Sequence, residues 1–184
     1  MARTHREQRM DRMVEAHAAS LRRYLLRRGA GDEAEDLAAE ALLVLWRRLD
    51  DVPREAELAW LYRTAWNLLA NHRRRLRPLS DPDADRVVGD FADGLIEDLA
   101  LRAAWRGLSE RDREVLRLVA WEGLGGPALA EALGIGTGGA GAALSRARAR
   151  LAAGWAAAQA ESPGPSATYR GARTQPVEVD DGRV

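Results

Sequence analysis

The chain has no cysteine and no lysine among its 184 residues. Without cysteine it can form no disulfide, no thiol nucleophile and no metal site with sulfur ligands. No apolar run approaches the roughly 18 residues that a membrane span requires. The N-terminal MARTHREQRMDRM also lacks the apolar stretch of a signal peptide. These absences predict a cytoplasmic protein that does not contact a membrane.

The sequence also lacks the residue patterns of an enzyme. The three histidines are scattered, and no Gly-rich phosphate loop follows a strand pattern. Asp81, Asp83 and Asp85 alternate as in a calcium loop, but an arginine and an alanine stand where such a loop requires glycine and glutamate. We therefore expect no catalytic activity, no metal and no cofactor.

The net charge is zero, but the charges are segregated along the chain. Residues 59–78 hold five arginines and no acid, and residues 140–155 hold three arginines and no acid. Residues 29–58, in contrast, hold nine acids against three arginines. Separate basic and acidic segments favour a nucleic-acid partner over a uniformly neutral surface. Because a lack of lysine is also typical of a GC-rich genome, arginine content alone decides nothing.

Hydrophobic periodicity predicts three helices in the first part of the chain, at residues 10–28, 33–49 and 58–77. Two glycines end the first helix, and Asp32 with Glu35 predicts a capping box for the second. The predicted buried stripe of the second helix consists of Leu37, Ala41, Leu42, Leu45, Trp46 and Leu49.

The third predicted helix reads LAWLYRTAWNLLANHRRRLR. It combines aromatic, amide and guanidinium groups, which are the groups that unstacked bases and a phosphate backbone require. A core helix with a basic last turn that complements its dipole would show the same pattern. The residues alone leave both interpretations open. Its predicted buried face consists of Leu58, Leu61, Ala65, Leu68 and His72.

Residues 78–94 are acidic and contain prolines and glycines, which is typical of a linker. Residues 95–158 show four further helical segments, with Ser109 and Asp112 capping the second of them. The last two are joined by a tight Gly-Ile-Gly turn, the layout of a helix-turn-helix. Residues 159–184 are Pro/Gly-rich and are predicted to be disordered. The predicted fold class is all-α, with a three-helix bundle at residues 8–77 and a helix-turn-helix domain at 95–158.

Three blocks of the sequence resemble alternative sigma factors of the extracytoplasmic-function type, in their actinobacterial form. They are AEDLAAEALLVLWRRL, WLYRTAWNLLANHRRR and SERDREVLRLVAWEGL, the last followed by a helix-turn-helix that ends in LSRARARL. Their order also matches that family: a promoter-melting domain (region 2), a linker and a region 4 domain. The resemblance covers about residues 8–156. It implies a chain that binds core RNA polymerase, directs it to promoter DNA and is held by an anti-sigma factor.

The resemblance also assigns roles to residues of the N-terminal part. One exposed face of the second helix would dock on the polymerase clamp, although the pattern alone also fits a solvated face. The loop at residues 50–57 and the third helix would capture the non-template strand of the minus-ten element. Trp60 fits a core position equally well. The polymerase-binding residues are then Asp36, Glu40, Leu43 and Arg47, and the DNA-binding residues are Trp60, Arg63, Asn67, Asn71, Arg73, Arg74 and Arg75.

The predicted recognition helix departs from the family, because it begins TGGAGAA where basic or polar side chains are usual. Glycine and alanine offer no side-chain hydrogen bonds to base edges. The remaining candidates for DNA contact are Thr137, Arg146, Arg148 and Arg150. We therefore expect weak contact with the minus-thirty-five region and a larger role in binding the polymerase flap.

Two other functions fit the same sequence. A degenerate sigma-like interaction protein would bind polymerase or a regulator without reading promoters, and the weak recognition helix supports it. A stand-alone helix-turn-helix regulator would require specific duplex binding without polymerase, which that helix is poorly equipped to provide.

Overall fold

The computed structural model describes residues 4–76 and 94–161, and within them every regular element is helical. This confirms the predicted all-α class. Nearly all of the predicted linker at 78–94, including Asp81, Asp83 and Asp85, lies outside the described residues, as does the tail beyond 161. The elements are α1 (His5–Arg27), η1 (Gly31–Glu33), α2 (Ala34–Arg47), η2 (Leu49–Asp51), α3 (Glu57–Leu76), α5 (Leu99–Arg106), α6 (Glu110–Ala120), α7 (Gly126–Leu133) and α8 (Thr137–Glu161).

Local sequence signals set several helix ends. The Ser109 hydroxyl accepts a hydrogen bond from the Asp112 amide at the start of α6, which confirms the predicted cap. Gly134 ends α7 in the left-handed conformation, with φ at 65°. The predicted capping box of Asp32 and Glu35 is wrong. Residues 31–33 form a 3₁₀ turn instead, and α2 begins without a side-chain cap.

Helices α1, α2 and α3 pack together as an N-terminal bundle. Its core side chains are almost fully buried, among them Leu21, Leu25, Leu45, Leu61 and Ala65. The predicted stripes are correct at Leu45, Leu61 and Ala65, because i, i+3 and i+4 spacing places side chains on one helix face. At the third helix, Trp60 and Leu69 are buried as well, whereas Leu58, Leu68 and His72 are only partly buried.

Trp46 does not belong to the buried stripe in which the pattern places it. The side chain is 38% exposed. The guanidinium of Arg6 lies over its ring at 4.9 Å from the centroid and forms an ion pair with Asp50 at 2.5 Å. A cation over the indole face stabilises an aromatic ring at a wet surface, so periodicity alone misplaces this residue.

Helices α5 to α8 form a C-terminal bundle in which the long α8 packs against α5, α6 and α7. Trp105 and Leu108 form a small apolar cluster with Leu116 and Leu151. Gly154 of α8 lies directly against Ala104 of α5, where a Cβ on the glycine would meet the alanine Cβ at 3.3 Å. Helix α8 is continuous despite the glycines near its start.

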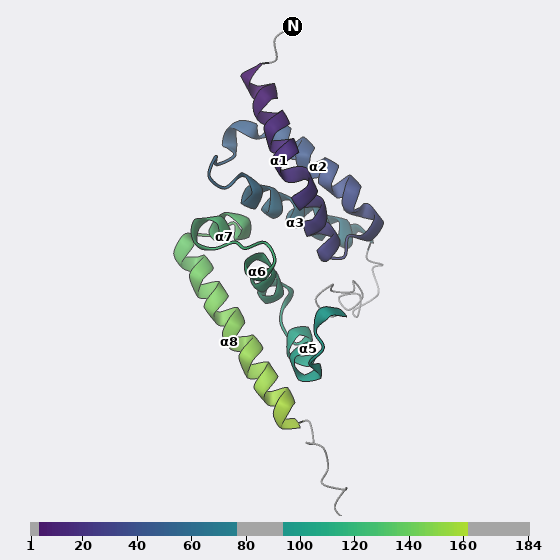
Figure 1. Cartoon of the computed structure of the whole chain (residues 1–184), viewed down its shortest axis with the longest axis vertical. Helices are drawn as coiled ribbons and strands as arrows, with labels where there is room; N and C mark the ends of the chain where they lie inside the picture. The colour runs from purple at the N-terminus through teal and green to yellow at the C-terminus, as the bar shows by residue number, and fades with distance from the viewer. Residues whose placement is uncertain (1–3, 77–93, 162–184) are drawn as a thin grey trace, which may run out of the picture.

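The two bundles contact each other, with α7 packed against α3 (Figure 1). One apolar core joins them, since Leu118, Leu129, Ala130 and Ala132 belong to the same buried cluster as the core of α1 to α3. The helix-turn-helix side of the C-terminal bundle therefore covers part of the helix that the sequence singles out for nucleic-acid contact.

Candidate nucleic-acid interface

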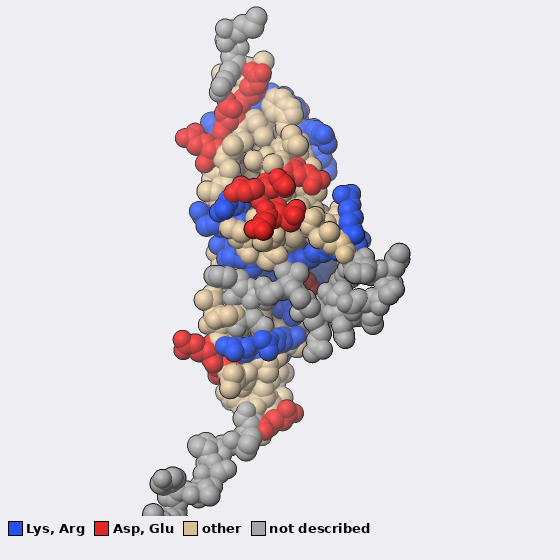
Figure 2. All heavy atoms as spheres, turned by 90° about the vertical axis from the view of Figure 1, so that its right-hand side faces the viewer, with Lys and Arg blue, Asp and Glu red and all other residues tan. Residues whose placement is uncertain are grey.

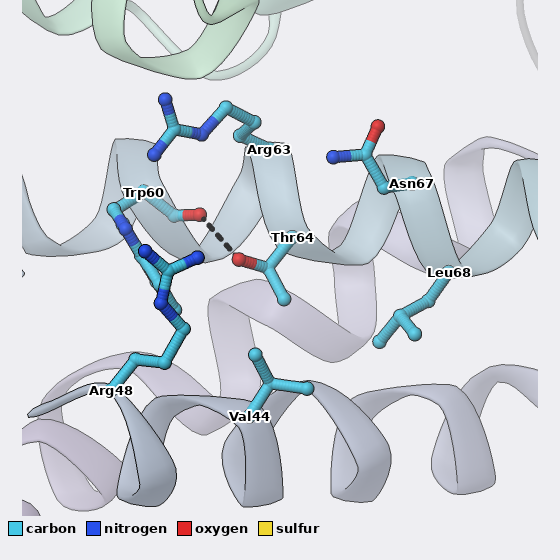
Figure 3. A pocket seen from close by; sticks show the side chains of 7 residues that line it. All are labelled: Val44, Arg48, Trp60, Arg63, Thr64, Asn67 and Leu68. Carbon is cyan, nitrogen blue, oxygen red and sulfur yellow. Dashed lines mark hydrogen bonds between the residues drawn. The ribbon is translucent and has the colours of Figure 1, made fainter.

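A hollow of about 440 Å³ opens between α2 and α3 (Figure 3). Five of its seven lining residues come from α3 at positions i, i+3, i+4, i+7 and i+8, so they share one helix face. The lining consists of Val44, Arg48, Trp60, Arg63, Thr64, Asn67 and Leu68. Three of the predicted DNA-binding residues therefore meet at one site.

The hollow has apolar walls and a polar rim. Trp60 is only 3% exposed, so it presents a small part of its indole. The Thr64 hydroxyl donates a hydrogen bond to the Trp60 carbonyl at 3.0 Å, which turns its methyl group toward the space between the helices. Arg63 and Asn67 supply guanidinium and amide groups at the rim. Apolar surface beside such groups suits a nucleotide, because bases need a flat contact and phosphates need cations.

Arg9 of α1 holds the loop that leads into α3. Its guanidinium donates to the Leu49 carbonyl at 2.8 Å, to the Val52 carbonyl at 2.9 Å and to Glu57 at 3.1 Å. Arg9 is 9% exposed and belongs to the buried polar residues. These three bonds fix the path of the loop at residues 49–57, beside the hollow. The partners lie 40 to 48 residues away in sequence, so no local pattern reveals them.

The arginine side chains at the C-terminal end of α3 point in two directions. Asn71, Arg74 and Arg75 are exposed, and Arg74 donates a hydrogen bond to the Asn71 side-chain oxygen. Arg73 turns inward and donates to the backbone carbonyl of Arg28. Trp66 is partly buried against the core of the bundle. Two of the three arginines in this run therefore face solvent, where a phosphate backbone could reach them.

The predicted polymerase-binding residues lie together on the exposed face of α2. Asp36, Glu40, Leu43 and Arg47 are all exposed, and Leu43 is 56% exposed. Figure 2 shows acidic side chains gathered on the surface of the N-terminal bundle. A large apolar side chain among charges on an unpartnered helix face is typical of a protein-binding surface.

The predicted DNA-binding residues of α8 lie apart from the hollow, on another element. Thr137, Arg146 and Arg148 are exposed. Arg150 forms an ion pair with Asp112 of α6, with its guanidinium 2.8 and 2.9 Å from the two carboxylate oxygens. Among the described residues, no group of three His, Asp or Glu side chains is placed to hold a metal.

Two carboxylates of the C-terminal bundle enter a socket on the N-terminal bundle. The Arg28 guanidinium donates to both oxygens of Glu114, at 2.8 and 3.0 Å, and to Glu122 at 3.0 Å. It also lies 3.5 Å above the ring of Tyr24, whose hydroxyl donates to Glu114 at 2.9 Å. Arg27 reaches Glu122 at 2.5 Å. The side chains of Arg28, Glu114 and Glu122 are at most 5% exposed.

Burial and the socket charges shift several pKa values. Burial, followed by the Glu114 carboxylate, raises the pKa of Tyr24 well above 10.0. Burial, followed by Glu122, raises the pKa of Tyr62, which stacks on Tyr24 with ring centroids 4.4 Å apart. Burial also raises the pKa of Glu114, and hydrogen bonds from Arg28 and Tyr24 offset part of that shift. The socket thus holds two neutral phenols beside paired charges.

This socket was not predicted from the sequence, and neither were the positions of Arg48, Thr64 and Arg9. Thr64 follows Trp60 by four residues, a spacing that could have placed it beside the predicted aromatic. The remaining contacts join segments far apart in the chain and have no local signature.

Comparison with known proteins agrees with this arrangement. The family model for sigma-70 region 2 matches residues 13–78, and the model for sigma-70 region 4 matches residues 98–151. No curated protein sequence matches the chain. The fold is similar to the co-crystal structure of the sigma factor RpoE in complex with the anti-sigma factor NepR from Bartonella quintana. That match has a TM-score of 0.54 and 23% identity, and it covers 78% of this chain and 94% of the other.

The matched segments together span more than half of the chain, and each coincides with one bundle of the structure. The N-terminal bundle is region 2, and the C-terminal bundle is region 4. The chain therefore belongs to the sigma-70 family, as a non-enzymatic, DNA-binding factor of transcription initiation that contains region 2 and region 4.

Proposed function

We propose that this sigma factor captures the non-template strand of the minus-ten element in the hollow between α2 and α3. The observation that carries the proposal is the meeting of Trp60, Arg63 and Asn67 around one space of about 440 Å³. The sequence predicts DNA contact for each of these residues, and the fold places all three around the hollow. The loop at residues 49–57, held by Arg9, forms the approach to this space.

The chemistry of the site supports capture of an unstacked base. Flipping a base out of the duplex costs a few kcal/mol, which contacts of the base with the apolar walls and of the neighbouring phosphates with the cations must offset. Because Trp60 is 3% exposed, its indole contributes as a wall of the hollow and not as a free stacking surface. Asn67 is exposed and free to contact a base edge, while Arg74 and Arg75 can hold phosphates.

The polymerase would be bound through two surfaces. The α2 face of Asp36, Glu40, Leu43 and Arg47 is assigned to the clamp. A second, apolar groove of about 330 Å³ between α5, α6 and α8 suits an apolar segment of the enzyme, such as its flap. The scarcity of side-chain donors at the start of α8 supports weak reading of the minus-thirty-five region.

An anti-sigma partner is part of the proposal. It is supported by the resemblance of the sequence and by the fold shared with RpoE, which was crystallised with the anti-sigma factor NepR. The resemblance to actinobacterial members stays a prediction from the sequence.

Run-off transcription tests the function directly. Core polymerase with this chain should produce transcripts from promoters enriched from a randomised library, whereas core polymerase alone should not. Asn67→Ala should reduce those transcripts, and the amide control Gln159→Ala, exposed on α8, should not. Absence of any stimulation by the wild-type chain would refute initiation. Polymerase binding without transcripts would instead favour the degenerate interaction protein.

A further inference from the structure

We propose that Arg48 binds a phosphate of the promoter strand and so holds the strand from the α2 side of the hollow. This inference rests on the proposed function, because it concerns the same hollow. The DNA-binding residues that the sequence predicts in this bundle all lie on α3. Arg48 adds a cation from a second helix.

The first observation is the position of Arg48 at the rim. It is the C-cap residue of α2 and lines the hollow together with Arg63 and Asn67 of α3. Figure 3 shows its side chain extending from α2 toward α3. A base that enters the hollow leaves its two neighbouring phosphates at the rim. Because both helices form that rim, a strand held only from α3 would leave the α2 side without a cation for its backbone.

The second observation is that the backbone carrying Arg48 is fixed. The Arg48 amide donates to two carbonyls of the last turn of α2, at 3.0 and 3.1 Å, and its carbonyl accepts from the Asp51 amide at 2.9 Å. The next carbonyl along the chain, that of Leu49, accepts from Arg9 at 2.8 Å. A fixed backbone restricts where the guanidinium can reach, which lowers the entropy that a bound strand has to remove.

The third observation is that the Arg48 side chain has an exposed, replaceable partner. Its Nε lies 3.1 Å from a carboxylate oxygen of Asp51, and the two side chains are 59% and 61% exposed. Exposed ion pairs contribute little to stability, because water screens the charges and both side chains lose conformational freedom. A phosphate accepts two parallel hydrogen bonds from a guanidinium. It can therefore replace the single bond to Asp51.

Arg63, the other arginine of the hollow, has a better shielded partner. It pairs with Glu131 of α7 at 2.8 Å, and the two side chains are 35% and 21% exposed. Charges attract each other more strongly where less water lies around them. Arg48 therefore exchanges its partner for a phosphate more readily than Arg63 does.

A phosphate contact has a signature that separates it from a base contact. Phosphates carry no sequence information, so losing the contact weakens binding evenly across sequences. Each phosphate neutralised on a single strand also contributes about 0.7 to the slope of log affinity against log salt concentration. Loss of Arg48 should lower both the affinity and this slope, and leave base preference unchanged.

The test uses the full chain bound to core polymerase and a labelled, mixed-sequence single-stranded DNA oligonucleotide. Binding is measured between about 50 and about 200 mM salt, and binding to core polymerase alone is subtracted. Arg48→Gln keeps a polar stem and removes the charge. We expect its affinity to fall by about fivefold at the lowest salt, the upper range for an exposed ion pair. Because the slope decreases by about 0.7, the difference should narrow to about twofold at the highest salt.

Three further variants make the result specific. Arg48→Lys should keep the slope of the wild type with intermediate affinity, because an ammonium retains the charge without the fork of donors. Arg12→Gln is the matched control: Arg12 is exposed on α1, and both its affinity and its slope should equal those of the wild type. Sequencing the bound oligonucleotides should show the base preference of the wild type for Arg48→Gln and a changed preference for Asn67→Ala. If Arg48→Gln loses its helical circular dichroism, Arg48→Ala carries the same test, because alanine favours helix.

Two outcomes would overturn the role of Arg48: an unchanged salt slope in the uncharged variant, or a change in its base preference. The first would leave Arg48 as half of a surface ion pair, and the second would make it a base contact. Run-off transcription separates this failure from failure of the proposed function. Transcripts from the wild type with an unchanged slope in Arg48→Gln would refute only the phosphate contact. Absence of transcripts from the wild type would refute the proposed function, whatever the salt slope shows.

Discussion

Replacing Arg9 by methionine is expected to lower the free energy of unfolding by about 3 kcal/mol, because it removes a buried charge from three partners at once. The Arg9 side chain is 11% exposed and that of Glu57 is 22% exposed. Methionine keeps an unbranched apolar stem and so limits the loss of packing. What disappears is the guanidinium that joins α1 to the loop at residues 49–57.

The magnitude follows from the partners that remain. Breaking a buried ion pair by removing one member costs about 3–5 kcal/mol. Glu57 retains contact with solvent and lies 3.8 Å from the His17 imidazole, so part of its cost is recovered. The carbonyls of Leu49 and Val52 each lose a hydrogen bond from a charged donor, worth about 1.5–3 kcal/mol at most. Water that enters the loosened loop can hydrogen-bond to the freed carbonyls and so recovers part of this loss. The expected decrease in the free energy of unfolding is therefore about 3 kcal/mol.

Urea unfolding of the full chain, followed by circular dichroism, measures the loss. Arg9→Lys should fall between wild type and Arg9→Met, because an ammonium keeps the charge but cannot reproduce the fork of donors. Arg12→Met is the control, since Arg12 is exposed and donates a hydrogen bond to a backbone carbonyl in its own helix. A loss below about 0.5 kcal/mol for Arg9→Met, the range of an ordinary surface change, would refute the role of Arg9 in holding this loop.

Three further outcomes are expected. Asn67→Ala should impair promoter melting, followed by permanganate reactivity, more than Arg148→Ala does, and the reverse ranking would contradict the division of labour between α3 and α8. Stability should fall as pH rises from about 9 to about 11, because burial keeps Tyr24 and Tyr62 protonated in the folded state while unfolded tyrosines ionise near 10.0. Tyr24→Phe should flatten that slope in thermal melts, and an unchanged slope would show that its phenol does not titrate differently on folding. Leu69→Ala should cost about 2–5 kcal/mol in urea unfolding, since Leu69 is 2% exposed; a loss under 1 kcal/mol would mean that the core relaxes into the space.

The helices of this protein follow from its sequence, because their signals are local. Apolar side chains three and four positions apart predict the buried faces around Leu45 and Leu61, and single residues such as Ser109 and Gly134 mark helix ends. The prediction for Trp46 failed because a distant residue intervened. Trp46 has the spacing of a core residue, but Arg6, forty positions away, covers its ring at the surface.

The sequence by itself determined the all-α class, the two groups of helices and the side chains able to contact nucleic acid. Only the tertiary structure decided which of those side chains meet. Arg63, Arg73 and Arg75 look alike in the sequence, yet one pairs with Glu131, one turns toward Arg28 and one is exposed. The hollow between α2 and α3 and the socket for Glu114 and Glu122 likewise join residues up to 95 positions apart. Helical periodicity shows which face of a helix is apolar. Which charged side chain comes to lie against the opposite face depends on how the helices pack.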